Sequence, residues 1–154
     1  MRTAVLLLLS VYSLAAQNST SSGRFHVEHP TLLNLGFEWL IDGDANRNAT
    51  VEVRFRKTGT AEWRPALPLL RIGGERVYRD RESMTYTVPE GFAGSILNLE
   101  PATSYECEFT LADPDGVTGP AQQRVTVSTR AEPKSYAGGR VLQSLDGVIP
   151  ARDH

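Results

Sequence analysis

Apolar and polar residues alternate along several short segments of this chain, and turn-forming residues separate the segments. The clearest alternation runs through residues 105–112, where every second side chain is apolar. A period of two residues places such side chains on one face of a β-strand. Three further segments show the same period: residues 33–39, 51–56 and 124–129. No stretch of convincing length has the period of a helix, so the pattern predicts an all-β protein.

Weaker segments add to the predicted strands. Residues 25–27 predict a short first strand, and residues 95–99 predict a later one. The turn Lys57–Thr60 leads into an arm that carries Trp63, which is typical of a β-hairpin. We therefore expect two sheets built from short, sequential antiparallel strands.

The stretch between Pro65 and Gly94 breaks this regularity. Prolines and glycines interrupt its short apolar pieces, and both residue types end strands or restrict them to edges. We expect irregular structure here, with a short edge strand near residues 84–88. Long loops on a rigid scaffold often carry binding residues, so this stretch is also a candidate for function.

The residues before the clearest strand predict a corner. Pro101 ends the preceding apolar run, and Thr103 and Ser104 are turn-forming residues. Tyr105 then begins the strand, two positions before Cys107. At such corners of immunoglobulin-like sandwiches, the tyrosine hydroxyl bonds to backbone a few residues upstream. The corner therefore favours a two-sheet β-sandwich.

Residues 24–130 resemble a fibronectin type III domain. The matching positions are Leu35, Phe37 and Trp39 in the second strand, Val53–Gly59 with Trp63 in the third strand and its hairpin, Leu99, Pro101, Thr103 and Tyr105 at the corner, and Asp115–Thr129 in the last hairpin. The resemblance implies an immunoglobulin-like β-sandwich of about seven antiparallel strands in two sheets. It gives structural roles to Trp39, Trp63, Leu99, Pro101 and Tyr105. Residues 67–94 are longer than the corresponding stretch of the family.

The chain begins with a predicted secretory leader. One positive charge at Arg2 precedes a short apolar run, and small residues follow it, so residues 1–16 form a signal peptide. The run is shorter than the about 20 apolar residues that a membrane span needs. We expect a secreted or cell-surface protein with no membrane span after cleavage. Residues 17–23 are small and polar and predict a flexible lead, while 131–154 predict a linker that opens a further domain.

Charge and cysteine content narrow the partners and the chemistry. The chain has 16 basic and 18 acidic residues, and losing Arg2 with the leader makes the mature chain slightly more acidic. This balance argues against nucleic acid as a partner. Cys107 is the only cysteine, so no disulfide forms within the chain, and we expect a small buried apolar role for it.

One cluster combines basic and aromatic residues, in the long stretch after Pro65. Its members are Arg71, Arg76, Tyr78, Arg79, Arg81 and Tyr86. Such a loop can contact an acidic partner, a polysaccharide or a neighbouring domain. Nearby acidic residues neutralise part of its charge, so a solvated loop is the alternative. We name this cluster the predicted contact loop.

Other constellations point less clearly to chemistry. Residues 42–48 have oxygen-bearing side chains at alternate positions, as in a calcium loop, but the same composition is common in hairpin turns. His26 and His29 offer too few partners for a closed zinc site. No nucleophile elbow of a serine hydrolase occurs, and the paired Glu106 and Glu108 are typical of a solvated strand face. We expect no metal, no cofactor and no catalysis within this chain.

Two functional hypotheses follow. The first is a non-catalytic, exported interaction or spacer module, the N-terminal accessory domain of a surface or polysaccharide-directed protein. Its partner is then a protein, a polysaccharide or a downstream domain of the same polypeptide. The second is the N-terminal part of a secreted hydrolase or β-helix carbohydrate-active enzyme, whose active site lies beyond His154. Direct glycan binding through Trp63 and the tyrosines of the long loop, Tyr78 and Tyr86, is a further alternative.

Overall fold

A computed structural model describes residues 17–78 and 85–134. These residues contain strands and no helix, and therefore no helix that is long and apolar enough to cross a membrane. The strands are β1 (Thr20–Val27), β2 (Leu35–Gly43), β3 (Thr50–Lys57), β4 (Arg64–Pro65), β5 (Leu70–Ile72), β6 (Arg76–Tyr78), β7 (Thr85–Thr87), β8 (Gly91–Ile96), β9 (Ser104–Ala112), β10 (Val117–Thr118) and β11 (Gln122–Ser128).

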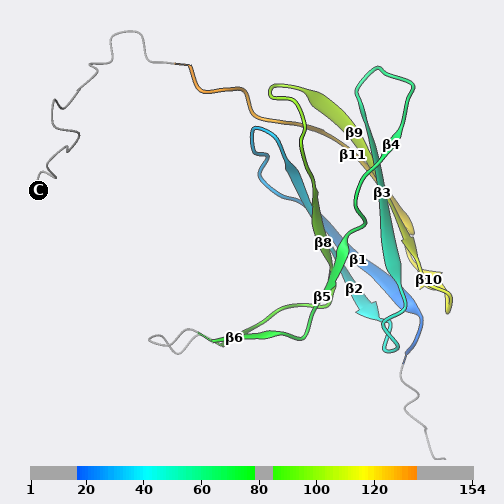
Figure 1. Cartoon of the computed structure of the whole chain (residues 1–154). Coiled ribbons are helices and arrows are strands. Elements are labelled where there is room, and N and C mark those ends of the chain that lie inside the picture. The colour runs from blue at the N-terminus through cyan, green and yellow to red at the C-terminus, as the bar shows by residue number, and fades with distance from the viewer. Residues whose placement is uncertain (1–16, 79–84, 135–154) are drawn as a thin grey trace, which may run out of the picture.

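Two main sheets face each other in a β-sandwich (Figure 1). The first has the strand order β10-β1-β2-β8-β5, and the second has the order β11-β9-β3-β4. Strands β6 and β7 form a separate two-stranded sheet. The prediction of an all-β sandwich with two main sheets is confirmed.

The core lies between the two main sheets and follows from the alternation in the sequence. In β2, Leu35, Phe37 and Trp39 are buried, while the residues between them are partly exposed. Phe109 of β9 faces them, with its ring centroid 4.6 Å from that of Phe37. Strand β1 adds Phe25, whose ring lies 4.9 Å from that of Phe109. Aromatic contacts across the sandwich therefore join both sheets.

The first strand is longer than predicted and is partly parallel. It begins at Thr20 instead of Phe25, and Thr20 and Ser21 pair in parallel with β10. The Thr20 amide donates to the Gly116 carbonyl at 3.0 Å, and its hydroxyl donates to Asp113 at 2.5 Å. The prediction of purely antiparallel sheets with about seven strands is therefore wrong. The parallel pairing arises because Thr20 and Ser21, which the sequence places in a flexible lead, find hydrogen-bond partners near the distant turn at residues 113–118.

The stretch after Pro65 is more regular than predicted. Strand β8 lies inside the first sheet between β2 and β5, and β7 pairs with β6 instead of a main sheet. Gly91 permits the approach of β8 to β2, since a Cβ there would lie 2.7 Å from the Trp39 carbonyl oxygen. Glycines that suggest a break in the sequence thus allow close packing of two strands.

The corner before β9 is held by side chains of two strands. The Glu100 amide donates to the Tyr105 hydroxyl at 3.0 Å, and the Tyr105 ring is buried. The Thr129 hydroxyl donates to the Glu100 carbonyl at 2.6 Å and accepts from the Thr103 amide at 3.0 Å. These bonds tie the turn after Leu99, which is itself buried, to the end of β11.

Candidate functional site

Three of the six members of the predicted contact loop lie on the hairpin of β6 and β7, which extends away from the two main sheets (Figure 1). Its three residue pairs join β6 only to β7. Arg76 and Tyr86 lie on this hairpin, and Tyr78 is the last residue of β6. Arg79 and Arg81 lie outside the described residues.

The hairpin presents an apolar pair to solvent. Val77 is directly opposite Tyr86 in the strand register, so their side chains share one face. Val77 is 51% exposed and Tyr86 is 54% exposed. Arg76 and its partner Thr87 are exposed as well. Because Arg76 precedes Val77 in the strand, its side chain lies on the opposite face of the hairpin. The exposed aromatic and aliphatic side chains make a surface suited to contact.

The base of the hairpin is fixed by local hydrogen bonds. The Gly74 amide donates to the Val88 carbonyl, and the Val88 amide donates to the Glu75 carbonyl, both at 2.9 Å. The Glu75 carboxylate accepts from the Gly73 amide at 2.8 Å. Bonds from its own amide and that of Gly73 lower the pKa of Glu75. Gly73 has a φ of 136°, where other residues are strained, so the turn requires glycine.

Arg71 differs from the other members of the predicted contact loop, because its side chain lies against the sandwich. Its guanidinium forms an ion pair with buried Asp44 and donates to Glu90 at 3.2 Å. It also lies 5.3 Å from the centre of the Phe92 ring. Arg71 therefore holds β5 against the turn after β2 instead of presenting its charge to a partner.

Asp44 also bears on the calcium alternative for residues 42–48. One carboxylate oxygen accepts from the Asn48 amide at 2.9 Å, and the other pairs with Arg71. Both oxygens are thus used by protein groups that close the turn. In residues 17–78 and 85–134, no group of three or more histidine, cysteine or acidic side chains is placed to hold a metal ion.

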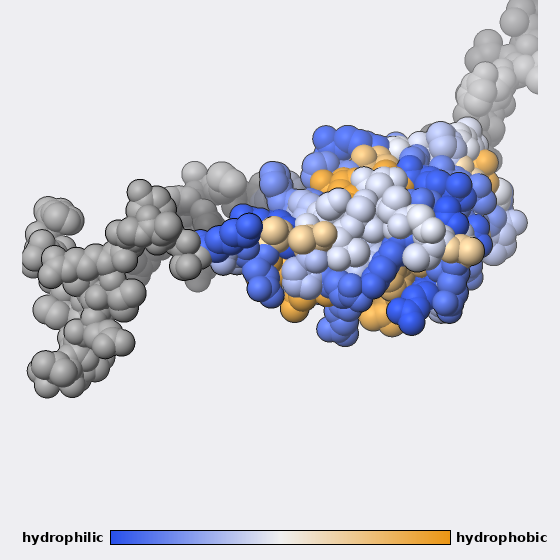
Figure 2. All heavy atoms as spheres, turned by 90° about the horizontal axis from the view of Figure 1, so that it is seen from above, coloured by the Kyte–Doolittle hydropathy of each residue, from blue (hydrophilic) through white to orange (hydrophobic). Residues whose placement is uncertain are grey.

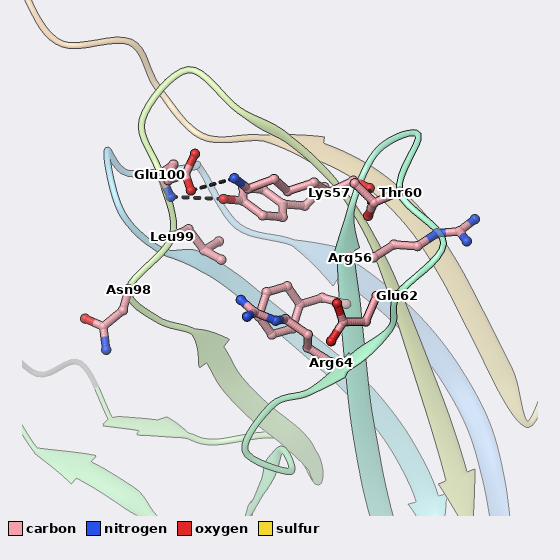
Figure 3. Close-up of a pocket in the computed structure, with 10 residues that line it drawn as sticks. Arg56, Lys57, Thr60, Glu62, Arg64, Asn98, Leu99 and Glu100 are labelled. Carbon is pink, nitrogen blue, oxygen red and sulfur yellow. Dashed lines mark hydrogen bonds and ion pairs between the residues drawn. The ribbon is translucent and has the colours of Figure 1, made fainter.

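A hollow of about 290 Å³ lies between the β3–β4 turn and the corner before β9 (Figure 3). Phe55, Leu99 and Tyr105 form its apolar lining. The Lys57 ammonium pairs with Glu100 at 2.5 Å at one end of this hollow. Arg64 and Glu62 lie at the other end, whereas the Arg56 guanidinium points away, as Figure 3 shows. The hollow is part of the corner's structure, because Leu99, Glu100 and Tyr105 line it.

The outer face of the second sheet carries a denser group of charges. We call it the outer-face cluster, and its members are Arg54, Arg56, Trp63, Glu106, Glu108 and Arg124. Strand pairing places Glu108 of β9 between Arg54 of β3 and Arg124 of β11. Arg54 Nε donates to one Glu108 oxygen at 2.6 Å, and Arg124 Nε donates to the other at 3.0 Å.

The second ion pair of this cluster joins Arg56 and Glu106. Two nitrogens of Arg56 donate to one carboxylate oxygen, at 3.0 and 2.6 Å. The Trp63 ring lies beside the guanidinium groups of the cluster, with ring-centre distances of 4.6 Å to Arg56, 5.1 Å to Arg54 and 5.5 Å to Arg124. Trp63 thus belongs to the outer surface, whereas Trp39 is a core residue.

Glu108 is buried, contrary to the solvated strand face that the sequence predicts for it. Only 5% of the residue is exposed, because two arginines and Trp63 surround it. Hydrogen bonds from Arg124 and Arg54 lower the pKa of Glu108. The alternating charges of β3 and β9 are visible in the sequence, but only the strand pairing shows that Glu108 lies between Arg54 and Arg124.

Cys107 lies on the opposite face of the same strand. It is fully buried, and burial raises the pKa of its thiol to about 12. The thiolate is the nucleophilic form, so this cysteine is inert in the folded protein.

No protein-family model matches the chain, and no curated protein matches it. Among solved structures, the chain is similar to one from the computer-based redesign of a β-sandwich protein. The two are 16% identical, the match covers 71% of this chain and 95% of that chain, and the TM-score is 0.37. The fold described above comes from the strand pairing and the core of this chain.

Proposed function

We propose that this chain is an exported interaction module of the fibronectin type III kind, which contacts a protein partner through the β6–β7 hairpin. It has no catalysis of its own and serves as the N-terminal accessory domain of a surface or polysaccharide-directed protein. One observation carries the proposal: within residues 17–78 and 85–134 the strands of the hairpin pair only with each other, and they expose Val77 and Tyr86 side by side.

The energetics of a lone hairpin support this assignment. A two-stranded hairpin is marginally stable in water, and the main sheets do not cover this one. Burying Tyr86 against a partner would remove apolar area from water, and tyrosine and arginine are enriched among the residues that dominate binding energy. Hydrogen bonds between Gly74, Glu75 and Val88 join the two arms at the base of the hairpin, which reduces the entropy lost on binding.

The family assignment rests on the corner and the core. The Tyr105 hydroxyl holds the corner backbone, and Trp39 packs at the centre of the sandwich. Both features occur in immunoglobulin-like sandwiches. On the face seen in Figure 2, polar side chains dominate and apolar ones form small separate patches, as expected for a domain that stays soluble until it meets a partner.

The test uses two immobilised proteins, residues 17–154 and the Tyr86→Ala variant of the same residues. Each is used to capture binding proteins from secreted and surface fractions of the native host. We expect a protein, identified by mass spectrometry, that the first binds and the variant loses by about tenfold or more. Direct titration of the purified protein then measures both affinities.

Trp63→Ala serves as the matched control, because it removes an aromatic residue from a different surface. It should keep the affinity of the unchanged chain. Both variants should keep the melting temperature within a few degrees, since neither residue belongs to the core. Equal binding by the Tyr86 variant and the unchanged chain would contradict the proposal.

A further inference from the structure

We propose a second binding site, for an acidic polysaccharide chain, in the groove beside Trp63 on the outer face of the second sheet. The groove measures about 450 Å³, and its lining includes Arg54, Trp63, Arg64, Glu108, Thr110 and Gln122. This site is independent of the hairpin, because the two surfaces lie on different sheets.

The first step of the argument concerns the donors that remain on two arginines. Arg54 and Arg124 bind Glu108 through their Nε and Nη2 atoms. Within the described residues, neither Nη1 atom makes a hydrogen bond or ion pair. Their side chains are 54% and 60% exposed. Each guanidinium thus keeps outward donors, and arginine donors fit planar carboxylates.

The second step concerns charge. Glu108 balances only one of the two arginines that bind it, while Arg56 and Glu106 balance each other. Arg64 and Glu52, which also line the groove, offset one another. The groove lining itself is therefore balanced, and one positive charge remains in the outer-face cluster beside the groove, where Arg124 lies. This charge is complementary to an anionic ligand. Since Glu108 is buried below the arginines, a ligand carboxylate can approach from the solvent side.

The third step concerns Trp63. Three guanidinium groups lie within 5.5 Å of its ring centre, and they hold the indole in one orientation at the groove. A fixed aromatic ring loses little entropy when a ligand packs on it. Its electron-rich face suits the C–H face of a sugar ring. Thr110 and Gln122 add a hydroxyl and an amide that can bond to sugar hydroxyls.

The last step separates a saccharide from an acidic peptide. A peptide commonly binds by adding a strand to an exposed sheet edge. The edge beside Trp63 is β4, which has two residues, and one of them is Pro65, without an amide hydrogen. The other edge is β11 (Gln122–Ser128), where a peptide could pair, and hexaglutamate in the test below measures that alternative. At Trp63 the groove offers side chains instead of a backbone edge. Stacking together with carboxylate contacts suits a uronic acid polymer.

The test is a calorimetric titration of residues 17–154 with hexagalacturonate, beside two hexamers that each lack one feature of it: neutral maltohexaose and hexaglutamate. We expect binding to hexagalacturonate that weakens with added salt, and at least about tenfold weaker binding to the other two. Trp63→Leu should reduce the affinity for hexagalacturonate by about tenfold, and Arg124→Lys by several-fold, because lysine keeps the charge but loses the planar donors.

Two controls keep the test decisive. Arg76→Gln and Tyr86→Ala change the hairpin and should leave hexagalacturonate binding unchanged. Trp63→Leu alters a residue outside the core, so this variant should keep the thermal unfolding transition of the unchanged chain. It therefore tests the site even if Arg124→Lys loses stability through its contact with Glu108. Absence of binding at millimolar hexagalacturonate, equal binding of hexaglutamate, or full affinity in Trp63→Leu would each overturn the proposal. Loss of partner binding in Tyr86→Ala alone bears only on the hairpin.

Discussion

Glu108 illustrates how a single residue combines structure with charge. Both its oxygens accept hydrogen bonds from arginines of neighbouring strands, and the residue is buried. Removing the charge by Glu108→Gln would leave two arginines facing an amide. We expect a loss of about 1–2 kcal/mol in the free energy of unfolding at pH 7. Urea unfolding of both proteins measures it.

The pH dependence of that loss follows from the pKa of Glu108. The folded-state pKa lies below the ordinary value of 4.5, so the stabilising contribution is complete above pH 4.5 and disappears as the pH falls through the folded-state value. The difference in stability between the unchanged chain and Glu108→Gln should therefore be constant near neutrality and shrink in acid. A difference that grows with acidity would contradict the ion-pair account.

At the scale of elements, the β6–β7 hairpin should be dispensable for folding. The Val88 amide bonds to the Glu75 carbonyl, so the two ends of the hairpin already meet. Replacing residues 76–87 by two glycines should keep the free energy of unfolding within about 1 kcal/mol, since no core residue is removed. Circular dichroism and thermal melting measure this, while partner capture by the shortened chain should fail. Cooperative unfolding lost in the shortened chain would mean that the hairpin supports the sandwich.

The same scale shows what could be predicted from sequence. Strands β2, β3, β9 and β11 could be predicted because a buried face repeats every second residue, and this signal is local. The start of β1 at Thr20 could not be predicted, because the hydrogen-bond partners of Thr20, Asp113 and Gly116, lie far along the chain. Gly91 suggested a turn, although only its contact with Trp39 explains it.

Some residues of the candidate sites could be predicted from the sequence, and others could not. Composition alone pointed to Arg76 and Tyr86, and the structure places them on an exposed hairpin. Composition could not separate Arg71 from them, since its ion pair with Asp44 depends on how β5 packs. The outer-face cluster required knowledge of the strand register, because its charges come from three different strands. Long-range pairing is therefore the missing information in each case.

At the scale of the whole molecule, the accessory-domain proposal predicts the size of the native product. A surface hollow of about 410 Å³ lies between Thr31–Asn34 and Arg130–Pro133, and it includes Leu32 and Leu33. Exposed leucines beside the path of the chain are the kind of surface that a following domain covers. We therefore expect an antibody against residues 17–134 to detect a protein clearly larger than 16.9 kDa in secreted or surface fractions.

Deleting the gene from the host should remove the band, which controls for cross-reaction. Hydrolysis of a polysaccharide by the larger protein, but not by residues 17–154, would place activity downstream and agree with an accessory role. A band at or just below 16.9 kDa would contradict that role, because the sandwich would then act alone. The hairpin and the groove beside Trp63 would in that case have to account for the whole function, and the binding tests on Tyr86 and Trp63 would measure it directly.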